Sequence, residues 1–465
     1  MKTNRRRFLT TLGATASATL LAPSVFDFKA FGSPFVRPDM SGLSAADPII
    51  LGYQTAIAAM QALPASDVRS WTYQAAIHGT TIMPAQTAWN TCQHGTHLFW
   101  AWHRMYLYWW ERIVRKMSGD SSWALPYWDW TSHTHLPAPF RVTTSNLYTP
   151  NRDPHINNGS GTLPASDVDY SAAFAELDYE TAQSSIEMLP HNIIHVDVGG
   201  YPDGVPGWMA TVPTAAQDPI FYLHHANMDR LWDLWLAQGG GRSDPTSDAT
   251  WTGTMFTFFD ENGKKVTMAP CDVLQAATQL NYTYEGEPSQ VPQSCGGIPP
   301  WIFTHLVLLV FPFPPIPIDG DPYILPVDIS DIVQQLEVDL WNPAKQVYLE
   351  LDGVATSKSP GVSWEVYVGL PAGVAANPQS PFYVGKLGLF GAGVRSDSHG
   401  NFKPTALRFN ATQALQTLLA GGGSNASLTF IARGILVRGK QVTPKVRSSV
   451  TVKEGKFIVA TRKAS

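Results

Sequence analysis

The sequence predicts a multidomain protein in which a mainly α-helical core, built on a four-helix bundle, precedes a C-terminal antiparallel β-sandwich. The chain has 465 residues, which is long enough for two or three domains that each bury a core. Apolar residues recur at three- and four-residue spacing in the first half of the chain, as in amphipathic helices. The last third instead contains short alternating segments rich in β-branched and aromatic residues, which are typical of strands.

The first 30 residues are predicted to be an export signal. Arg5, Arg6 and Arg7 precede Phe8 and a short, mildly apolar stretch, the order found in signal peptides. Adjacent arginines followed by Phe-Leu resemble the twin-arginine type of signal. We therefore expect a periplasmic or secreted protein. The apolar stretch is too short to span a bilayer, so no membrane anchor is expected.

Residues 31–285 are assigned to the helical domain. Helical spacing is clearest in Tyr53–Leu63, Met105–Met117 and Phe221–Leu236. Residues 286–328 are predicted to be a linker, because prolines follow one another there and proline neither continues a helix nor sits inside a sheet.

Residues 329–465 are assigned to the β-sandwich. Short strand-like segments separated by Gly and Asn support this assignment. They are Gln346–Leu351, Trp364–Val368, Leu428–Ile431 and Ser449–Val452.

Charge and cysteine content narrow the class of protein. The net charge is −5 and only 15% of residues are charged, so no nucleic-acid partner is expected. Three cysteines allow one disulfide at most and leave one thiol over. Cys271 and Cys295 are candidates for a pair in an oxidising compartment, although the sequence does not give their distance.

One set of histidines lies in the second half of the helical region. His191 and His195 are four residues apart, which places both imidazoles on one face of a helix. The zinc-protease motif is disfavoured, because Asn192 stands where that motif needs a glutamate. Further along, His225 lies four residues before Asp229 and would complete a set of three imidazoles.

A second set lies upstream. His94 and His103 flank an aromatic run, and His78 comes near the end of an earlier predicted helix. Two all-imidazole triads without a carboxylate ligand favour copper over magnesium or calcium, and they lack the carboxylate of non-haem iron sites. Zinc remains the alternative.

Two longer motifs resemble the copper signatures of tyrosinases, catechol oxidases and molluscan haemocyanins. One runs from Asp218-Pro219 to His225 and Asp229, the other from His94 through Trp102-His103-Arg104 to Glu111. Further segments are similar to plant polyphenol oxidases. They are Leu125–Trp130, Phe258–Asn262, Tyr282–Tyr284 and Trp364–Val368.

This resemblance implies two copper ions that use dioxygen to hydroxylate monophenols and to oxidise o-diphenols to o-quinones. The implied partners are small phenolic substrates. The implied ligands are His78, His94 and His103 for copper A, and His191, His195 and His225 for copper B. His97 and His224 compete for two of these places. The spacing of nine positions from His94 to His103, and the acid four residues after His225, favour the stated set.

The resemblance also implies roles near the ligands. Cys92 stands two residues before His94, where fungal tyrosinases and molluscan haemocyanins form a thioether to the imidazole. Glu187 and Asn192 match positions proposed in the family to hold a water that takes the phenol proton. Val212 lies where plant catechol oxidases often carry Phe, so an open mouth is expected.

Two other functions stay open. One is a catechol oxidase without the hydroxylase step, and the other is a dioxygen-binding protein like haemocyanin, although haemocyanins repeat the copper unit many times. The C-terminal sandwich resembles the domain that shields the site in latent plant enzymes. We therefore expect it to act as a shielding domain.

Overall fold

The structure is a computed structural model that describes residues 33–464, apart from several short gaps. These gaps are residues 203–204, 289, 297–300, 318–321, 357–361, 391–404, 438–439 and 443–448. The predicted export signal therefore lies outside the described residues. Within the described part of the chain, no helix combines the length and the apolarity needed to cross a membrane.

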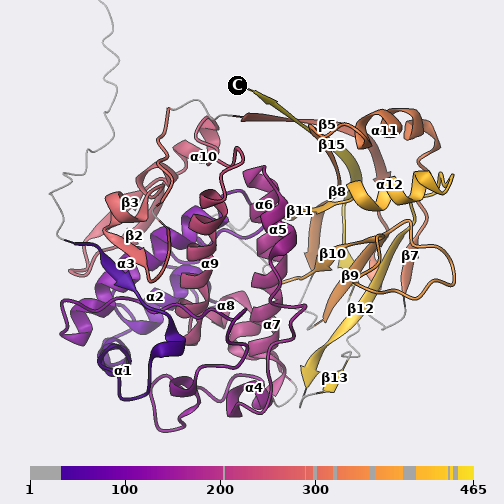
Figure 1. The fold of residues 1–465 in the computed structure, drawn as a ribbon. Coiled ribbons are helices and arrows are strands. Elements are labelled where there is room, and N and C mark those ends of the chain that lie inside the picture. Colours follow the sequence, from indigo (N-terminus) through magenta and orange to yellow (C-terminus); the bar gives the residue numbers. More distant parts are fainter. Residues whose placement is uncertain are drawn as a thin grey trace, which may run out of the picture. The chain divides into compact units, whose positions relative to one another are not determined.

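The first part is helical, as predicted (Figure 1). Its longer helices are α1 (Pro48–Ala62), α2 (Trp71–His78), α3 (Phe99–Ser118), α6 (Tyr179–Ile186), α7 (Ile193–Gly199) and α9 (Ile220–Ala237). Shorter ones are α4 (Pro154–Asn158), α5 (Ser171–Ala175), α8 (Val212–Ala215) and α10 (Ala249–Gly253). Two small β-ribbons accompany them, β1 (Phe35–Arg37) with β4 (Tyr282–Tyr284) and β2 (Phe256–Phe259) with β3 (Lys265–Met268).

Local side chains set where these helices begin and end. Asp47 accepts a hydrogen bond from the Ile49 amide at the start of α1, and Ser70 caps α2 through the Tyr73 amide. Helix α3 ends at Gly119, whose φ of 76° is easily adopted only by glycine. At the start of α9, Asp218 accepts from the Ile220 amide and is itself held by the buried Arg152 guanidinium.

The helix predicted around His191 is broken. Residues Glu187–Asn192 form a π-type turn, η3, and α7 begins only at Ile193. Leu189 is extended, with φ of −144° and ψ of 121°, and Pro190 has no backbone N–H for the helix ladder. His191 and His195 still face each other, with 4.6 Å between their ring centroids, although they stand on two consecutive elements.

The C-terminal part is an antiparallel β structure, which confirms the predicted fold class. One sheet has the order β10-β9-β12-β13 with β7 also on β12, and the other has the order β5-β15-β8-β14-β6 with β11 also on β8. Their strands are β5 (Trp301–Pro312), β6 (Ile316–Pro317), β7 (Tyr323–Leu325), β8 (Lys345–Thr356), β9 (Val362–Val368), β10 (Tyr383–Leu387), β11 (Thr405–Asn410), β12 (Leu428–Val437), β13 (Lys440–Val442), β14 (Ser449–Thr451) and β15 (Glu454–Ala464). Helices α11 (Val333–Leu340) and α12 (Thr412–Ala420) lie among them. Buried side chains from both sheets form one apolar cluster.

The expectation of an irregular linker over 286–328 does not hold for residues 301–312. They form β5, which pairs with β15 along its whole length. Strand β5 is at the edge of its sheet, and Pro312 is its last residue, so the missing N–H of proline interrupts no ladder. The sheet region therefore begins near residue 301.

A disulfide joins Cys271 to Cys295, with 5.8 Å between their Cα atoms. It ties the segment that follows β4 to the helical part. The remaining cysteine, Cys92, is buried and does not take part in a disulfide.

Candidate metal centre

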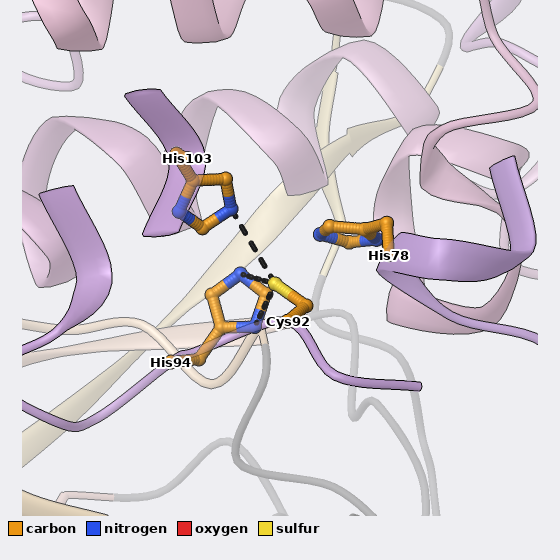
Figure 2. A group of neighbouring side chains, drawn as sticks. All are labelled: His78, Cys92, His94 and His103. Atoms are coloured by element: carbon orange, nitrogen blue, oxygen red, sulfur yellow. Dashed lines mark hydrogen bonds between the residues drawn. The ribbon is translucent and has the colours of Figure 1, made fainter. Parts of the chain in front are cut away.

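Two clusters of buried side chains that can bind metal lie in the helical part. The first contains His78, Cys92, His94 and His103 (Figure 2), and the second contains His191, His195, His224 and His225. Within each cluster, one potential ligand atom per residue lies within 4.8 Å of the others. Each of the eight side chains is at most 3% exposed, so bulk water does not compete for these atoms.

Backbone carbonyls fix the orientation of the imidazoles in the first cluster. His78 ends α2 and its Nδ1 lies 3.1 Å from the carbonyl oxygen of Val212. His103 stands in α3 and its Nδ1 lies 2.8 Å from the carbonyl of Phe99. A carbonyl only accepts hydrogen bonds, so each Nδ1 carries the proton and each Nε2 carries a lone pair, as in metal-ligating histidines.

In the second cluster, too, Nδ1 atoms donate to oxygens and leave the Nε2 lone pairs available for a metal. The Nδ1 of His195 donates to the Met209 carbonyl at 2.9 Å, and the Nδ1 of His191 lies 3.0 Å from Oδ1 of Asn192. The Nε2 atoms of His195 and His225 are 3.2 Å apart, a distance expected of two ligands on one ion. Among the residues that the structure describes, the buried Nε2 of His191 has no hydrogen-bond partner. A metal ion would satisfy this orphaned nitrogen.

His224 differs from the other histidines of its cluster. The indole N–H of Trp130 donates to its Nδ1 at 3.2 Å. A neutral imidazole whose Nδ1 accepts a hydrogen bond carries its proton on Nε2. The Nε2 of His224 therefore has no lone pair to offer to a metal.

Burial keeps these imidazoles neutral. It lowers the pKa of His191 to about 3, against smaller opposing effects of the hydrogen bonds that the ring donates to the Asn192 side chain and to the Glu187 backbone. Burial also lowers the pKa of His195 and of His225 well below the ordinary value, and neighbouring histidines lower both further. Neutral imidazoles with no carboxylate among them suit copper, so the histidine-rich site fits two copper ions.

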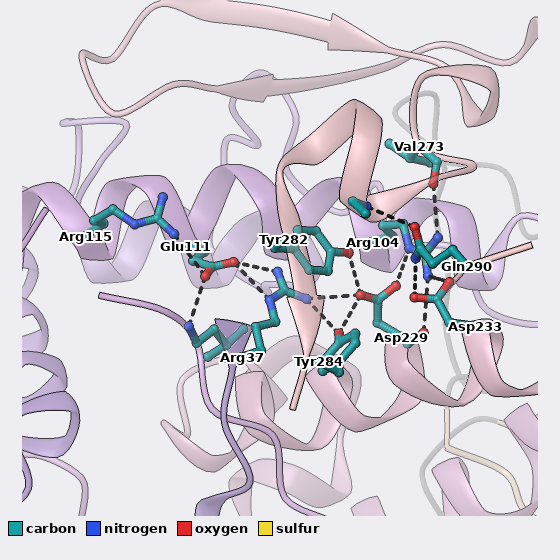
Figure 3. Close-up of polar contacts among 12 residues, drawn as sticks. Arg37, Arg104, Glu111, Arg115, Asp229, Asp233, Val273, Tyr282, Tyr284 and Gln290 are labelled. Atoms are coloured by element: carbon teal, nitrogen blue, oxygen red, sulfur yellow. Dashed lines mark hydrogen bonds and ion pairs between the residues drawn. The ribbon is translucent and has the colours of Figure 1, made fainter. Parts of the chain in front are cut away.

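A buried network joins α3, which carries His103, to α9, which carries His225 (Figure 3). Asp229 of α9 is ion-paired with Arg104 of α3 and with Arg37, whose Nη1 lies 3.0 Å from Oδ2. The hydroxyls of Tyr282 and Tyr284 donate to the same carboxylate at 2.6 Å. Burial raises the pKa of Asp229, but Arg104 and Arg37 outweigh it and hold that pKa below the ordinary value. Arg104 is the residue after His103, and Asp229 lies one helical turn after His225. The ion pair between Arg104 and Asp229 therefore sets the distance between the two clusters.

Cys92 lies against the first cluster. Its Sγ is 3.4 Å from Nδ1 and 3.7 Å from Nε2 of His94, and 3.4 Å from Nε2 of His103 (Figure 2). The Cε1 carbon of an imidazole lies between its two nitrogens, so the sulfur faces that carbon of His94.

The other predicted residues also lie near the clusters. Oε1 of Glu187 accepts from the Gly95 amide at 2.6 Å, next to the loop that carries His94. Asn192 uses its carbonyl for His191, and its Nδ2 donates to the Gly388 carbonyl at 3.1 Å. Val212 contacts the site through its own carbonyl, which holds His78.

The remaining histidines stand apart from both clusters. The Nε2 of His97 lies 3.6 Å from Oδ2 of Asp248, and the His97 side chain is 27% exposed. His133, His135, His155 and His305 belong to neither cluster among the residues that the structure describes, and His399 falls in a gap.

The sequence reasoning missed Phe390. Its ring is stacked on that of His195, with 3.8 Å between centroids and 6° between planes, and lies 5.5 Å from the ring of His94. Phe390 follows β10, so a side chain from the C-terminal part enters the metal centre. Gly388, two residues earlier, approaches Asn192 closely, since a Cβ at this position would lie 2.8 Å from the Asn192 Cβ. No periodicity or motif near residue 390 signals these contacts.

Comparisons with known proteins agree with this geometry. The common central domain of tyrosinase matches residues 68–177 and 166–238, the polyphenol oxidase middle domain matches 245–293, and a domain of unknown function matches 327–427. Tyrosinase HcTyr1 of Hahella sp. (strain CCB-MM4) is 35% identical over 295 residues, or 51% of this chain and 61% of the relative. The latent form of polyphenol oxidase of Prunus armeniaca is 32% identical over 313 residues, or 58% and 50%.

The solved structure of latent apple tyrosinase has the same fold. Its TM-score is 0.63 at 22% identity, and the match covers 94% of this chain and 99% of that chain. Fold and site together define a binuclear metal protein whose helical core carries a C-terminal β region. The chain belongs to the tyrosinase and polyphenol oxidase family. The matched regions span only 61% and 50% of the first two relatives.

Proposed function

We propose that this protein oxidises phenols with dioxygen at a pair of copper ions, hydroxylating monophenols and converting o-diphenols to o-quinones. The observation that carries the proposal is the convergence of buried imidazoles in two adjacent clusters. The proposed ligands are His78, His94 and His103 at one copper, and His191, His195 and His225 at the other. The protonated Nε2 of His224 supports the choice of His225.

The copper pair, when bound, activates dioxygen and accepts electrons from the phenol. The protein must also take the phenol proton, because a free phenol has a pKa near 10. Glu187 and Asn192 are proposed to hold the water that takes it. Asn192 keeps its amide donor directed away from His191, because its carbonyl already accepts from that ring. The donor becomes available to a water once the Gly388 carbonyl moves away.

Cys92 is proposed to form a thioether with Cε1 of His94. The new C–S bond replaces one S–H and one C–H bond, so two protons and two electrons are released. Dioxygen would take them up and become hydrogen peroxide, and copper held by the histidines would supply the redox chemistry. The position of Sγ between the two ring nitrogens supports this choice. A tethered ring would hold its Nε2 more rigidly at the copper.

The C-terminal sheet region is proposed to shield the site. Phe390 supports this role, because it fills the space beside His195 that a phenol ring would need. The proposed boundaries are an export signal in residues 1–30, a metal domain over 31–285, and a shielding domain over 329–465 that also takes in β5 to β7. Residues 1–30 are proposed to direct twin-arginine export to the periplasm or beyond, which cell fractionation of the chain with and without Arg5 and Arg6 would test.

Oxygen uptake tests the proposed activity. Copper-loaded protein with an inserted protease site between Cys295 and Trp301 is assayed with L-tyrosine and with L-DOPA, before and after cleavage. Consumption with both substrates, rising after cleavage, is expected. Activity with L-DOPA alone would indicate a catechol oxidase. Reversible dioxygen binding without turnover, even after cleavage, would indicate a haemocyanin-like protein.

A further inference from the structure

The segment Lys386–Phe390, here called the cover segment, makes contacts with the helical part at three points. It begins at the end of β10, and Lys386, Gly388 and Phe390 are its contact residues. The Phe390 contact is apolar and therefore weakly directional. The other two contacts are polar and directional, so they are the ones able to fix where the segment sits.

Lys386 places a buried charge in the helical part. Its ammonium is ion-paired with Asp167 and lies 3.2 Å from the Ser166 hydroxyl, and its side chain is 6% exposed. The buried carboxyl of Asp197 also interacts electrostatically with Lys386. A buried ammonium is stable only beside such partners, so displacement of the segment has to hydrate or replace both charges.

Gly388 provides the second polar contact. Its carbonyl accepts from Nδ2 of Asn192 at 3.1 Å. A Cβ at residue 388 would lie 2.8 Å from the Asn192 Cβ and 3.0 Å from the Met188 carbonyl oxygen. The Met188 atom belongs to the backbone of η3, so it cannot rotate away. Only glycine allows this approach without a shift of the segment.

We propose that the Lys386–Asp167 ion pair and the Gly388–Asn192 hydrogen bond form a two-point latch that holds Phe390 on His195 and withholds the Asn192 amide from the reaction. This inference rests on the proposed function of the site. It adds that the cover acts twice, since it fills the space for the phenol ring and also occupies the donor proposed for the water. Release of either point of the latch is expected to loosen the whole segment, because a single residue separates Gly388 from Lys386 on one side and from Phe390 on the other.

Hydrogen exchange of the full chain, followed by mass spectrometry, tests the latch without depending on copper. The peptide covering residues 383–390 is compared in Lys386→Met, Asp167→Asn and Gly388→Ala variants, both metal-free and copper-loaded. Loss of a charged hydrogen bond predicts exchange about tenfold faster than in the unmodified protein. Lys456→Met is the matched control, because Lys456 pairs only within the sheets, with Asp352 at 3.1 Å.

A double variant that exchanges the two charges of the ion pair distinguishes loss of the latch from general destabilisation of the protein. The double variant Lys386→Glu with Asp167→Lys should recover protection of the segment that each single change loses. Wild-type exchange rates in all three single variants would overturn the latch, and so would equal loosening by Lys456→Met. If the segment loosens as expected but no variant oxidises L-DOPA with bound copper, the proposed function fails and the latch stands.

Discussion

The ring of Phe390 lies parallel to the imidazole of His195, with 3.8 Å between their centroids and 6° between their planes. Both side chains are buried, at 2% and 0% exposure. One residue belongs to the region that follows β10 and the other to α7, so the pair joins the C-terminal part to the metal centre.

Replacing Phe390 by Ala should activate the uncut protein. Removal of the ring opens the space beside His195, so L-DOPA oxidation by the full chain is expected to rise severalfold at unchanged copper content. Oxygen uptake and metal analysis measure the two quantities. Phe313→Ala is the control, because Phe313 is also buried, at 6% exposure, but packs within the sheets, with 5.7 Å between its ring centroid and that of Phe430. Equal activation by both variants would show that the effect comes from loosening the sheets.

Changes at the adjacent residues His224 and His225 should affect the copper content differently. His225→Ala is expected to lower the copper content from two ions towards one and to abolish oxidation. His224→Ala should keep both ions, since its Nε2 carries a proton. It should cost about 1–3 kcal/mol of stability, because the Trp130 N–H is left without its acceptor. Loss of copper in His224→Ala would contradict the assigned tautomer.

A thioether between Cys92 and His94 should be visible by mass. Copper-loaded, oxygen-exposed protein is denatured and digested, and the peptide containing both residues is expected to be two hydrogens lighter than its sequence mass. Protein kept free of copper serves as the control and should show the full mass. A Cys92 thiol that reacts fully with an alkylating reagent after turnover would rule the bond out.

Changes at Glu187 and Asn192 should affect the two reactions unequally. In the cleaved protein, Asn192→Gly or Glu187→Gln is expected to slow tyrosine hydroxylation at least about tenfold, since positioned proton transfer contributes on this order or more. Catechol oxidation should change little. Steady-state rates on both substrates provide the measurement, and losses of the same size on both would argue against the water-holding role.

Glu176 should make stability depend on pH. Its carboxylate accepts from Nδ2 of Asn410 at 2.9 Å and lies 2.6 Å from the Tyr348 hydroxyl. Burial raises its pKa from 4.5 to about 7, against the effect of these two partners. The folded protein therefore keeps a proton that the unfolded chain releases, and the stability gained at low pH is lost as the pH rises towards 7.

The size of this effect follows from the shift. The rise in the pKa of Glu176 on folding corresponds to a loss of roughly 3 kcal/mol in the free energy of unfolding between pH 4.5 and pH 8. Glu176→Gln should remove that dependence, so the variant gains stability relative to the unmodified protein as the pH rises. Thermal unfolding of metal-free protein across this range measures the trend. Glu180→Gln is the control, because the Glu180 side chain is 48% exposed. Parallel curves for Glu176→Gln and the unmodified protein would contradict the shift.

Features of the site that depend on local spacing could be predicted from the sequence. The spacing of His191 and His195, and the acid one turn after His225, predicted which histidines come together. The physical reason to prefer His225 over His224 as a ligand is the hydrogen bond that Trp130 donates to His224. Trp130 is 94 residues away in the chain, so local spacing does not indicate this contact.

Other features depended on long-range packing. The prolines of residues 286–328 suggested a linker, but residues 301–312 form the edge strand β5, where the terminal Pro312 is tolerated. Phe390 lies 195 residues after His195, and neither its neighbours nor their periodicity indicates that its ring enters the site. The histidine spacing suggested one continuous helix through His191 and His195, but Pro190 interrupts the helix ladder just before His191.

Because Phe390 and His195 belong to one chain, dilution of the protein cannot separate them. A tethered group faces its site at an effective concentration on the order of millimolar, set by the connecting chain and not by the amount of protein. In the intact chain, a phenol would therefore have to compete with the Phe390 ring, whose local concentration is constant. After a cut before β5, the released sheet region would become an ordinary inhibitor, whose effect fades as the solution is diluted and returns as it is concentrated.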